Sequence, residues 1–364
     1  MLETVKYLMG SPGPSGYGSK TTAEDVTAAA EAACSDLRCI TAIVTGATSG
    51  IGAETARVLA MRGVRLVLPA RSLKAAEETK ARIAAEFPGA EVFVLPSISA
   101  PSPPSAASPP DSSPSASPST SSCIHHIHIH YIYTTIRFVP NNAGRFSYDC
   151  ALSEDGVEMT FATNYLGRHF LLTKLLLETM AETARASGIE GRIVNVSSGI
   201  HGWFSGDMLR YLDMLTARRS YALSKLANVL HTKALAERLK EMGANVTANC
   251  VHPGIVRTRL TRDRDGFITE HYRKLTTPRR SSDLLFLLAS RLLKTIPQAA
   301  ATTCYVATHP ALQGVSGKYF ADCNEAAPSK SASDGRAASQ LWRASEAMTA
   351  EKAAGRFPEK PQEL

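Results

Sequence analysis

The chain has 364 residues, of which 44% are hydrophobic, and a formal net charge of +7 at pH 7. It is long enough to bury a full core, and a single α/β domain of this length is ordinary. Its seven cysteines show neither paired metal-ligand spacing nor a disulfide pattern, which indicates a reducing compartment. We expect no secretory signal in residues 1–30, and the longest apolar run, residues 284–289, is too short to span a bilayer. These features predict a soluble or peripheral protein.

The first chemical signal is a glycine-rich turn that follows a short buried strand at residues 41–44. Within residues 45–52, Gly46 permits a sharp turn, Gly50 lets a pyrophosphate approach the backbone, and Gly52 lets the following helix pack closely on the sheet. The N-terminus of that helix offers free N–H groups to phosphate. Because the spacing is not the G-x-G-x-x-G of other dinucleotide folds, the turn alone also fits an ordinary strand-to-helix connection.

Strands and helices then alternate along the chain. Residues 65–68 have the pattern of a second strand, residues 73–87 that of a helix and residues 91–95 that of a third strand. This alternation predicts an α/β fold with a doubly wound parallel sheet of the Rossmann type, in a single domain.

The next stretch does not continue the alternation. Residues 97–122 are almost wholly Ser, Pro and Ala, a composition that cannot form a packed element, and a His-rich tract follows at residues 123–133. Residues 131–139 have the content of a fourth strand, but Pro140 removes a ladder donor and is awkward in a central strand. We therefore expect residues 97–139 to be an anomalous, disordered segment in place of the region around strand 4. Our preferred hypothesis is that this segment is not the evolved sequence of the fold.

Three histidines of that tract, His126, His128 and His130, alternate onto one face if the tract is a strand. Such a face is able to bind a metal, but a His-rich composition without second-shell partners is weak support for a site. We predict no metal.

The α/β pattern resumes downstream with a long helix at residues 156–180, whose apolar face includes Leu175 and which also carries Asn164. A strand at residues 192–196 follows. Ser198 lies just past the carboxyl end of this strand, where open α/β sheets bind their ligands.

Tyr221 and Lys225 are four residues apart in a stretch that the following apolar residues mark as helical, so both side chains leave one face. A free tyrosine has a pKa of about 10, so ionising it at neutral pH requires about 4 kcal/mol. An ammonium about 4 Å away supplies energy of that order at an effective dielectric of ~20. The pair is therefore a candidate proton donor, although Tyr-x-x-x-Lys also arises by chance.

Together these motifs resemble those of the short-chain dehydrogenase/reductase family, in the family's order. The matching features are the T-G-x-x-x-G-I-G of residues 45–52, the N-N-A-G of residues 141–144, Ser198, the Tyr221/Lys225 pair and the Pro-Gly turn at residues 253–254. Within the family, residues 13–17, 224–228 and 316–323 are similar to plant members related to retinol dehydrogenases, including the dehydrogenase of the chloroplast inner-envelope translocon.

The resemblance implies an oxidoreductase that interconverts a carbonyl and an alcohol on a small hydrophobic substrate. In the family, Ser198 and Tyr221 hydrogen-bond the reacting oxygen, and Tyr221 delivers the proton. Lys225 lowers the pKa of Tyr221 and holds the nicotinamide ribose, and Asn164 holds a water that relays protons to Lys225. The expected catalytic residues are Asn164, Ser198, Tyr221 and Lys225. The expected cofactor-binding residues are Gly46, Ser49, Gly50, Ile51, Gly52, Arg71, Asn142, Ala143, Gly144, Tyr221, Lys225, Pro253, Gly254, Val256 and Thr258.

Arg71 decides which cofactor we expect, because the family places the group that meets the adenosine ribose just past the second strand. A carboxylate there favours the ribose hydroxyl of NAD, whereas an arginine favours the 2′-phosphate of NADP. We therefore predict NADP(H). The alternative interpretation is a solvated surface arginine.

Three regions are expected: an extension at residues 1–38, the NADP-binding domain at residues 39–325 and a C-terminal helix or tail at residues 326–364.

Residues 281–294 are apolar with basic ends, which indicates either the lid that the family places over the substrate or a helix that contacts a membrane surface or calmodulin. Nucleic-acid binding is not expected, because aromatic and basic residues are not interleaved. An oligomer is allowed, although the segment at residues 97–139 compromises the usual interface.

Two functions remain open from the sequence. The first is the reductase described above, and the second is a non-catalytic or degraded subunit that senses redox state in a chloroplast envelope protein-import complex. The intact catalytic residues favour the first, whereas the anomalous segment at residues 97–139 argues against activity. The resemblance implies a peripheral protein of the chloroplast inner envelope, with the cytoplasm as the alternative.

Overall fold

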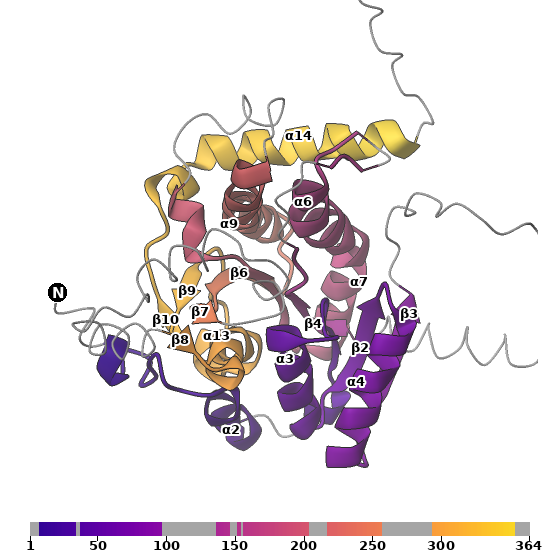
Figure 1. The fold of residues 1–364 in the computed structure, drawn as a ribbon, viewed down its shortest axis with the longest axis vertical. Coiled ribbons are helices and arrows are strands. Elements are labelled where there is room, and N and C mark those ends of the chain that lie inside the picture. The colour runs from indigo at the N-terminus through magenta and orange to yellow at the C-terminus, as the bar shows by residue number, and fades with distance from the viewer. Residues whose placement is uncertain are drawn as a thin grey trace, which may run out of the picture.

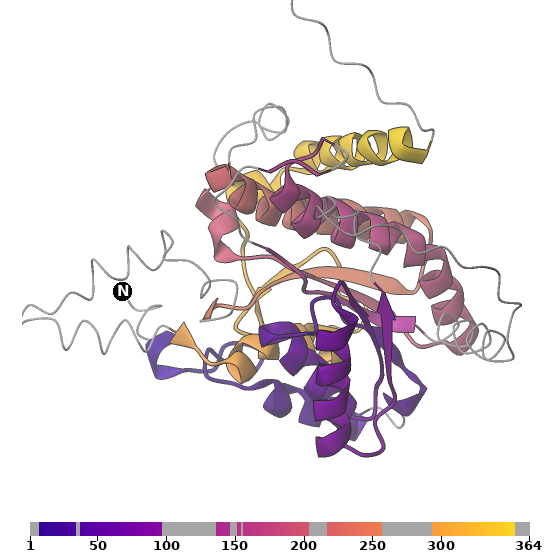
Figure 2. The same cartoon turned by 45° about the vertical axis from the view of Figure 1, so that its right-hand side comes forward.

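The computed structural model describes most of the chain apart from two long intervals. The described residues are 7–33, 37–96, 136–145, 151–153, 156–203, 217–256 and 293–353. They form a sheet between two layers of helices (Figures 1 and 2). Outside the described residues lie the Ser/Pro-rich tract, the His-rich tract, Thr258 and residues 281–292 of the segment with basic ends. The expectations for these residues are therefore not tested.

One eight-stranded sheet forms the centre of the described part. Its strands, in spatial order, are β10 (Asn324–Glu325), β9 (Tyr319–Ala321), β6 (Val246–His252), β5 (Gly191–Val196), β4 (Ile136–Asn141), β1 (Thr41–Ile43), β2 (Arg65–Ala70) and β3 (Val92–Pro96). Neighbouring strands are parallel except β9 and β10. The mostly parallel sheet of Rossmann type is therefore as predicted. A separate parallel pair joins β7 (Ile255–Val256) to β8 (Leu293–Lys294).

β1 and β4 are neighbours in this sheet, although they are far apart in the sequence. From this pair the strand order runs outward in two directions, through β2 and β3 on one side and through β5 and β6 on the other. Open α/β sheets bind ligands in the crevice at the carboxyl ends of the strands where the order reverses. The glycine turn, the N-N-A-G loop and Ser198 follow the carboxyl ends of β1, β4 and β5.

Helices cover both faces of the sheet. One face carries α2 (Ala23–Ala33), α3 (Gly50–Met61), α4 (Leu73–Glu86) and α13 (Ile296–Thr308). The other carries α6 (Met159–Phe161), the π-helical stretch η2 (Ala162–Leu171), α7 (Leu172–Ser187), α9 (Ala217–Glu241) and α14 (Gly335–Ala353). Figure 2 shows α14 lying outermost, across the layer of α9. Short 3-10 turns are η1 (Leu37–Cys39), η3 (Gly199–Trp203), η4 (Pro310–Leu312) and η5 (Lys330–Ser333).

Strand β4 corrects two of our expectations. Residues 136–139, which we placed in the anomalous segment, form a buried central strand between β1 and β5. Pro140 belongs to the same strand, where we thought a proline awkward. On the side of β1 the ladder has already ended at Ile43, and the carbonyl of Pro140 accepts the N–H groups of Thr45 at 3.2 Å and Asn142 at 3.0 Å. Because the N–H and C=O of one residue point to the same side of a strand, the missing donor of Pro140 faces the end of β1 and leaves the ladder to β5 intact.

The long helix predicted at residues 156–180 is present as a continuous helical run from α6 to α7, but its middle is the π-helical stretch η2. Hydrogen bonds from i to i+5 insert extra residues into a turn and so change the phase of the apolar face. Phe161, Tyr165 and Phe170 are buried as this face, whereas Leu175 is 73% exposed. Our assignment of Leu175 to the apolar face was therefore wrong.

Both flanks of the domain pack into its core. Val26 of α2 is fully buried in the layer that α2 shares with α13, and Trp342 of α14 is buried in the core cluster beside α9. The side chain of Asn324 accepts the N–H of Ser15 at 2.9 Å and donates to the carbonyl of Tyr17 at 3.0 Å. The packed unit therefore extends beyond the domain that we bounded at residues 39 and 325.

Candidate active site

The glycine turn after β1 is fastened onto the N-N-A-G loop after β4. The hydroxyl of Thr45 accepts the N–H groups of Asn142 and Ala143 at 3.0 and 3.1 Å. Gly46 has φ +68°, and a β-carbon on it would lie 2.8 Å from Cα of Ala143. A β-carbon on Gly52 would lie 2.4 Å from Nδ2 of Asn142. Neither position has room for a side chain, which explains the two glycines.

The start of α3 has the features of an anion site. Ser49 is its N-cap residue, with φ −164°, and its hydroxyl makes no capping hydrogen bond. Gly50 has φ +57°, a left-handed conformation that other residues rarely adopt. The first-turn N–H groups at Gly50 and Ile51 thus lack a side-chain cap, and uncapped N–H groups at a helix N-terminus bind phosphate. This geometry fits the pyrophosphate of a dinucleotide.

Asn164 holds the end of the N-N-A-G loop. Its Oδ1 accepts the N–H of Arg145 at 2.7 Å, and its Nδ2 donates to the carbonyl of the same residue at 2.8 Å. Nδ2 also donates to Oγ of Ser224 at 3.2 Å. A β-carbon on Gly144 would stand 3.6 Å from both Oδ1 of Asn164 and Nζ of Lys225. The structure therefore brings Asn164, Gly144 and Lys225 together, and the water-holding role of Asn164 stays a prediction.

Tyr221 and Lys225 both lie on α9. Lys225 is only 4% exposed, and its Nζ lies 5.7 Å from the centroid of the Tyr221 ring and donates to the carbonyl of Val196 at 3.1 Å. Burial lowers the pKa of Lys225 to about 8 and raises the pKa of Tyr221 to about 12. The pKa of Tyr221 therefore shifts upward and not downward, because desolvation of the phenolate is the dominant effect on it, and the expected lowering contribution of Lys225 stays a prediction.

Ser198 is the second residue after β5 and is half-buried. The hydroxyl of the preceding Ser197 donates to the carbonyl of Lys225 at 2.7 Å, which ties the end of β5 to α9. Oγ of Ser198 accepts the N–H of Ile200 at 3.4 Å, and its carbonyl lies 2.7 Å from Nδ1 of His201. Ser198 thus lies at the same end of β5 as the carbonyl that binds Lys225.

The Pro-Gly turn after β6 reaches the same edge of the sheet. Nδ1 of His252 accepts the N–H of Gly254 at 3.4 Å, and Gly254 has φ +89°. Pro253 is buried, and Val256 is half-buried in β7. Thr258, the last residue expected to bind the cofactor, lies outside the described residues.

Arg71 directly follows β2 and is exposed. The next residue, Ser72, caps α4 by accepting the N–H of Ala75 at 3.3 Å. Because β2 is the parallel neighbour of β1, Arg71 lies at the same edge of the sheet as the glycine turn. This position suits contact with an adenosine 2′-phosphate, while the choice between NAD and NADP stays a prediction.

A buried polar network beneath the site was missed from the sequence. Nδ2 of Asn141 donates to Oδ1 of Asn195 at 3.0 Å and to Oγ1 of Thr173 at 3.2 Å, and Nδ2 of Asn195 donates to Oγ1 of Thr232 at 2.9 Å. The network joins β4 and β5 to α7 and α9. The one available signal was that two asparagines stand near the carboxyl ends of strands that lie in the core. Thr45, His201 and His252 were missed as well.

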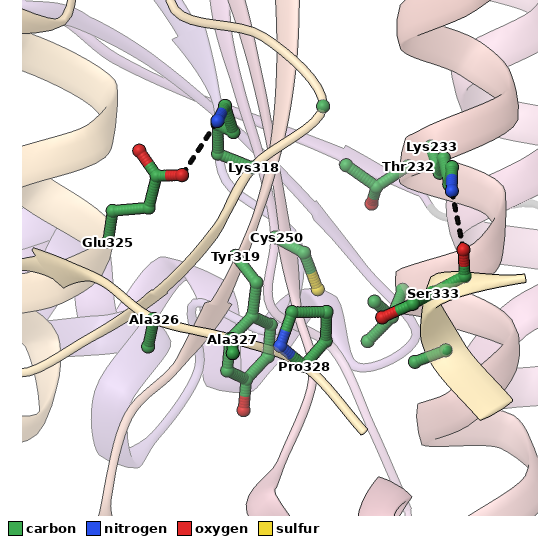
Figure 3. Close-up of a pocket in the computed structure, with 13 residues that line it drawn as sticks. Thr232, Lys233, Cys250, Lys318, Tyr319, Glu325, Ala326, Ala327, Pro328 and Ser333 are labelled. Atoms are coloured by element: carbon green, nitrogen blue, oxygen red, sulfur yellow. Dashed lines mark hydrogen bonds and ion pairs between the residues drawn. The ribbon is translucent and has the colours of Figure 1, made fainter. Parts of the chain in front are cut away.

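A pocket of about 560 Å³ lies along α9, beyond Lys225 (Figure 3). Thr232 and Lys233 of α9, Cys250 of β6 and Tyr319 of β9 line it. Figure 3 shows its two charged contacts, an ion pair between Lys318 and Glu325 at 2.7 Å and a hydrogen bond from Lys233 to the carbonyl of Ser333 at 2.6 Å. The lining on α9 begins at Val229, one helical turn after Lys225, and Cys250 is the fifth of the seven residues of β6.

Comparison with known protein families identifies the family of the chain. The sequence model described as short chain dehydrogenase matches residues 40–98 and 119–267. The chain belongs to the short-chain dehydrogenase/reductase family. The match includes residues 119–139 of the segment that we considered foreign to the fold, so between its two parts only residues 99–118 are unmatched.

Two relatives show where this dehydrogenase is placed within the family. The short-chain dehydrogenase TIC 32 B, chloroplastic, of Brassica napus is 42% identical over 346 residues, which are 94% of this chain and 97% of that protein. Retinol dehydrogenase 14 of Homo sapiens is 36% identical over 328 residues, 85% of each chain. The predicted resemblance to the retinol dehydrogenase-like subgroup is confirmed.

Solved structures agree with the family fold. A protein from Mycobacterium paratuberculosis titled as putative and uncharacterized is 25% identical, covers 85% of this chain and 93% of its own, and has a TM-score of 0.56. A variant of the actinorhodin polyketide ketoreductase, solved with NADPH, is 23% identical, with coverage of 79% and 96% and a TM-score of 0.54, which shows the shared fold. Within the described ranges of this dehydrogenase, no helix has the length and apolarity to cross a membrane.

Proposed function

We propose that this dehydrogenase uses NADP(H) to interconvert a carbonyl and an alcohol on a small hydrophobic substrate. Family membership supports the coarser statement, an oxidoreductase that depends on NAD or NADP. The observation that carries the proposal is the meeting of Tyr221, Lys225, Asn164 and Gly144 beside the carboxyl ends of β4 and β5. The position of Arg71 after β2 supports NADP rather than NAD.

The residues of the chain divide the work of binding and proton transfer. The start of α3, the glycine turn and Arg71 would hold the dinucleotide, whose nicotinamide would supply the hydride for the carbonyl carbon. Negative charge grows on the substrate oxygen, where Ser198 and Tyr221 donate hydrogen bonds and Tyr221 gives up its proton. Because burial raises the pKa of Tyr221, the phenol is protonated at neutral pH, as a donor must be. The ammonium of Lys225 stabilises the phenolate that this transfer leaves.

Two exposed apolar side chains support a hydrophobic substrate. Trp203, at the end of η3, is 71% exposed, and Ile255, at the start of β7, is 43% exposed. Both follow the carboxyl ends of strands that lead into the site, β5 and β6. The relative retinol dehydrogenase 14 is named for an apolar alcohol, which agrees with such a substrate.

The test uses the full chain with NADPH, NADH and a panel of hydrophobic aldehydes and ketones that includes retinal. We expect NADPH to raise the melting temperature and at least one carbonyl to be reduced, as followed by the loss of NADPH absorbance. Tyr221→Phe should lower kcat by roughly 10²- to 10⁴-fold and leave the shift with NADPH intact. Full activity of this variant would refute the assignment. Binding of NADPH without turnover of any carbonyl would favour a non-catalytic, redox-sensing subunit instead.

We also propose a chloroplast location, which the chloroplastic relatives from Brassica napus support. A fluorescent fusion of the full chain in leaf cells tests it, and a cytoplasmic signal without plastid fluorescence would contradict it. Peripheral attachment to the inner envelope is checked by whether alkaline carbonate releases the protein from isolated envelopes.

A further inference from the structure

Two histidine rings hold the peptide group that joins Ser198 to Gly199. Nδ1 of His201 lies 2.7 Å from the carbonyl oxygen of Ser198. At the other end of the same peptide, the N–H of Gly199 donates to Nδ1 of His252 at 3.1 Å. A carbonyl oxygen only accepts and a backbone N–H only donates, so Nδ1 of His201 carries a proton and Nδ1 of His252 carries none.

The second contacts of the rings require both histidines to be neutral. Nε2 of His201 accepts the N–H of Ser329 at 3.1 Å, so this nitrogen is unprotonated. Nδ1 of His252 accepts a second N–H, from the Pro-Gly turn. Burial lowers the pKa of His201, and burial followed by the charge of Lys294 lowers the pKa of His252 to about 4, against the opposing charge of Asp322. His201 is 4% exposed, and the ring of Tyr319 lies 5.1 Å from it.

These contacts lie just past the last backbone hydrogen bond between β5 and β6. The last backbone bond from this end of β5 to β6 is the N–H of Ser197 to the carbonyl of Val251, at 2.8 Å. Two peptides further on, the peptide between Ser198 and Gly199 has no strand partner in the described ladder and is held by the two rings instead. Ser198 is half-buried and Gly199 is exposed, and the two rings supply the hydrogen-bond partners of the peptide between them.

We propose that His201 and His252 are positioning residues that clamp the Ser198–Gly199 peptide and thereby aim the hydroxyl of Ser198 at the reacting oxygen. The inference rests on the proposed role of Ser198 in carbonyl reduction. The direction of a serine hydroxyl follows its backbone, and a displacement of about 1 Å in a catalytic group costs about 10²-fold in rate. Neither histidine touches the reacting atoms in this arrangement.

Isosteric amides separate the clamp from a merely structural role of His201. His201→Asn keeps a donor near the position of Nδ1 and loses the contact with Ser329. His201→Gln keeps an acceptor for the N–H of Ser329 and loses the donor to the carbonyl of Ser198. The clamp predicts that His201→Asn stays within a few-fold of wild type in kcat, and that His201→Gln and His201→Ala lose roughly 10- to 100-fold with KM for NADPH unchanged. If His201 only fastens the segment around Ser329, the Gln variant is the active one and the inference fails.

Isosteric amides also test His252, whose Nδ1 must accept the N–H of Gly199. His252→Asn retains an oxygen near Nδ1 and should keep activity, whereas His252→Ala and His252→Gln should lose roughly 10- to 100-fold in kcat. His309 provides a matched control, because its Nδ1 also accepts a backbone N–H, from Ala311 at 3.3 Å, in a turn away from the site. We expect His309→Ala to leave kcat unchanged. Equal losses in all three histidine-to-alanine variants would contradict a specific clamp.

Hydrogen exchange of the Gly199 amide tests the clamp without any substrate. We expect this amide to be protected in wild type and in His252→Asn, and to exchange at least 10-fold faster in His252→Ala at an unchanged melting temperature. An unprotected Gly199 amide in wild type overturns the inference. If the wild type reduces no carbonyl, the proposed function fails, and the exchange result alone decides the clamp.

Discussion

At the residue scale, the burial of Lys225, for which we propose a catalytic role, destabilises the fold. It is 4% exposed, and burial lowers its pKa from 10.5 to about 8. The folded state therefore binds fewer protons than the unfolded state between about pH 8 and 10.5, so stability from this group rises with pH across that window and is lowest below it. The full shift corresponds to about 3 kcal/mol of destabilisation at neutral pH.

Lys225→Met should consequently abolish turnover and still stabilise the fold. We expect an increase of up to about 3 kcal/mol in the free energy of unfolding near pH 7, which shrinks as the pH approaches 10.5. Urea denaturation at the two pH values measures it. A loss of stability in Lys225→Met near pH 7 would show that the hydrogen bond to Val196 outweighs the cost of burying the charge.

Arg71 is the residue at which cofactor preference should change. Arg71→Ala removes the cation that we place beside the 2′-phosphate, so KM for NADPH should rise about 10-fold or more while KM for NADH changes little. The ratio of kcat/KM for the two cofactors measures this. Arg62→Ala is a suitable control, because Arg62 lies at the opposite end of α3 from the glycine turn. An unchanged ratio of kcat/KM for NADPH and NADH in Arg71→Ala would contradict the NADP assignment.

At this scale, the sequence predicted the local features and missed the non-local ones. The Tyr221/Lys225 pair and the glycines at 46 and 52 follow from spacing along one helix or one turn. The roles of His201 and His252 depend on where the ends of β5 and β6 meet, which no local pattern encodes. The direction of the Tyr221 pKa was missed because burial depends on the whole packed core.

At the element scale, the contact between α9 and α14 buries a histidine whose ring nitrogens are not hydrogen-bonded within the described part of the chain. His231 is 1% exposed, stacks on Trp342 with centroids 5.4 Å apart, and has no hydrogen-bond partner for either ring nitrogen among the described residues. Burial, followed by the charge of Arg238, lowers its pKa from 6.5 to about 3. The unfolded state therefore binds more protons between pH 6.5 and 3, so stability is lost as the pH falls through this window.

His231→Phe should remove this part of the acid sensitivity. Between about pH 8 and about pH 5, protonation of His231 in the unfolded chain costs wild type about 2 kcal/mol. We expect the difference in unfolding free energy between the two pH values to be smaller by about that amount in His231→Phe, and likewise in His231→Leu if phenylalanine does not fit. Because each variant is compared with itself at two pH values, a packing defect cancels. An unchanged pH dependence would contradict the assignment.

Most elements could be predicted because their patterns are local, and the exceptions share one cause. The π-helical stretch at η2 shifts the phase of the apolar face and exposes Leu175, an effect of hydrogen-bond register that apolar spacing does not reveal. Pro140 stands in a central strand because its neighbour β1 ends at Ile43. Both outcomes depend on how one element meets another.

At the scale of the whole molecule, the segment before β1 is part of the packed unit and not an appendage. α2 lies against α13 and α3, with Val26 fully buried, and Asn324 ties Ser15 and Tyr17 to β10. Composition alone did not reveal this, because α2 is short and rich in alanine, and its main partner is a helix more than 250 residues later.

Removal of this segment should therefore weaken the fold as a whole. Val26→Ala deletes two buried methyl groups, worth about 2 kcal/mol, which corresponds to a fall of roughly 4 to 8 °C in melting temperature for a domain of this size. Ala28→Ser, at an exposed position of the same helix, should change it little. Deletion of residues 1–33 should lower the melting temperature further than Val26→Ala or prevent soluble expression, because it uncovers the face of α13 that α2 now buries. If the deleted chain melted within about 2 °C of the full chain, α2 would contribute nothing to the core, and the domain would begin at residue 39 as the sequence suggested.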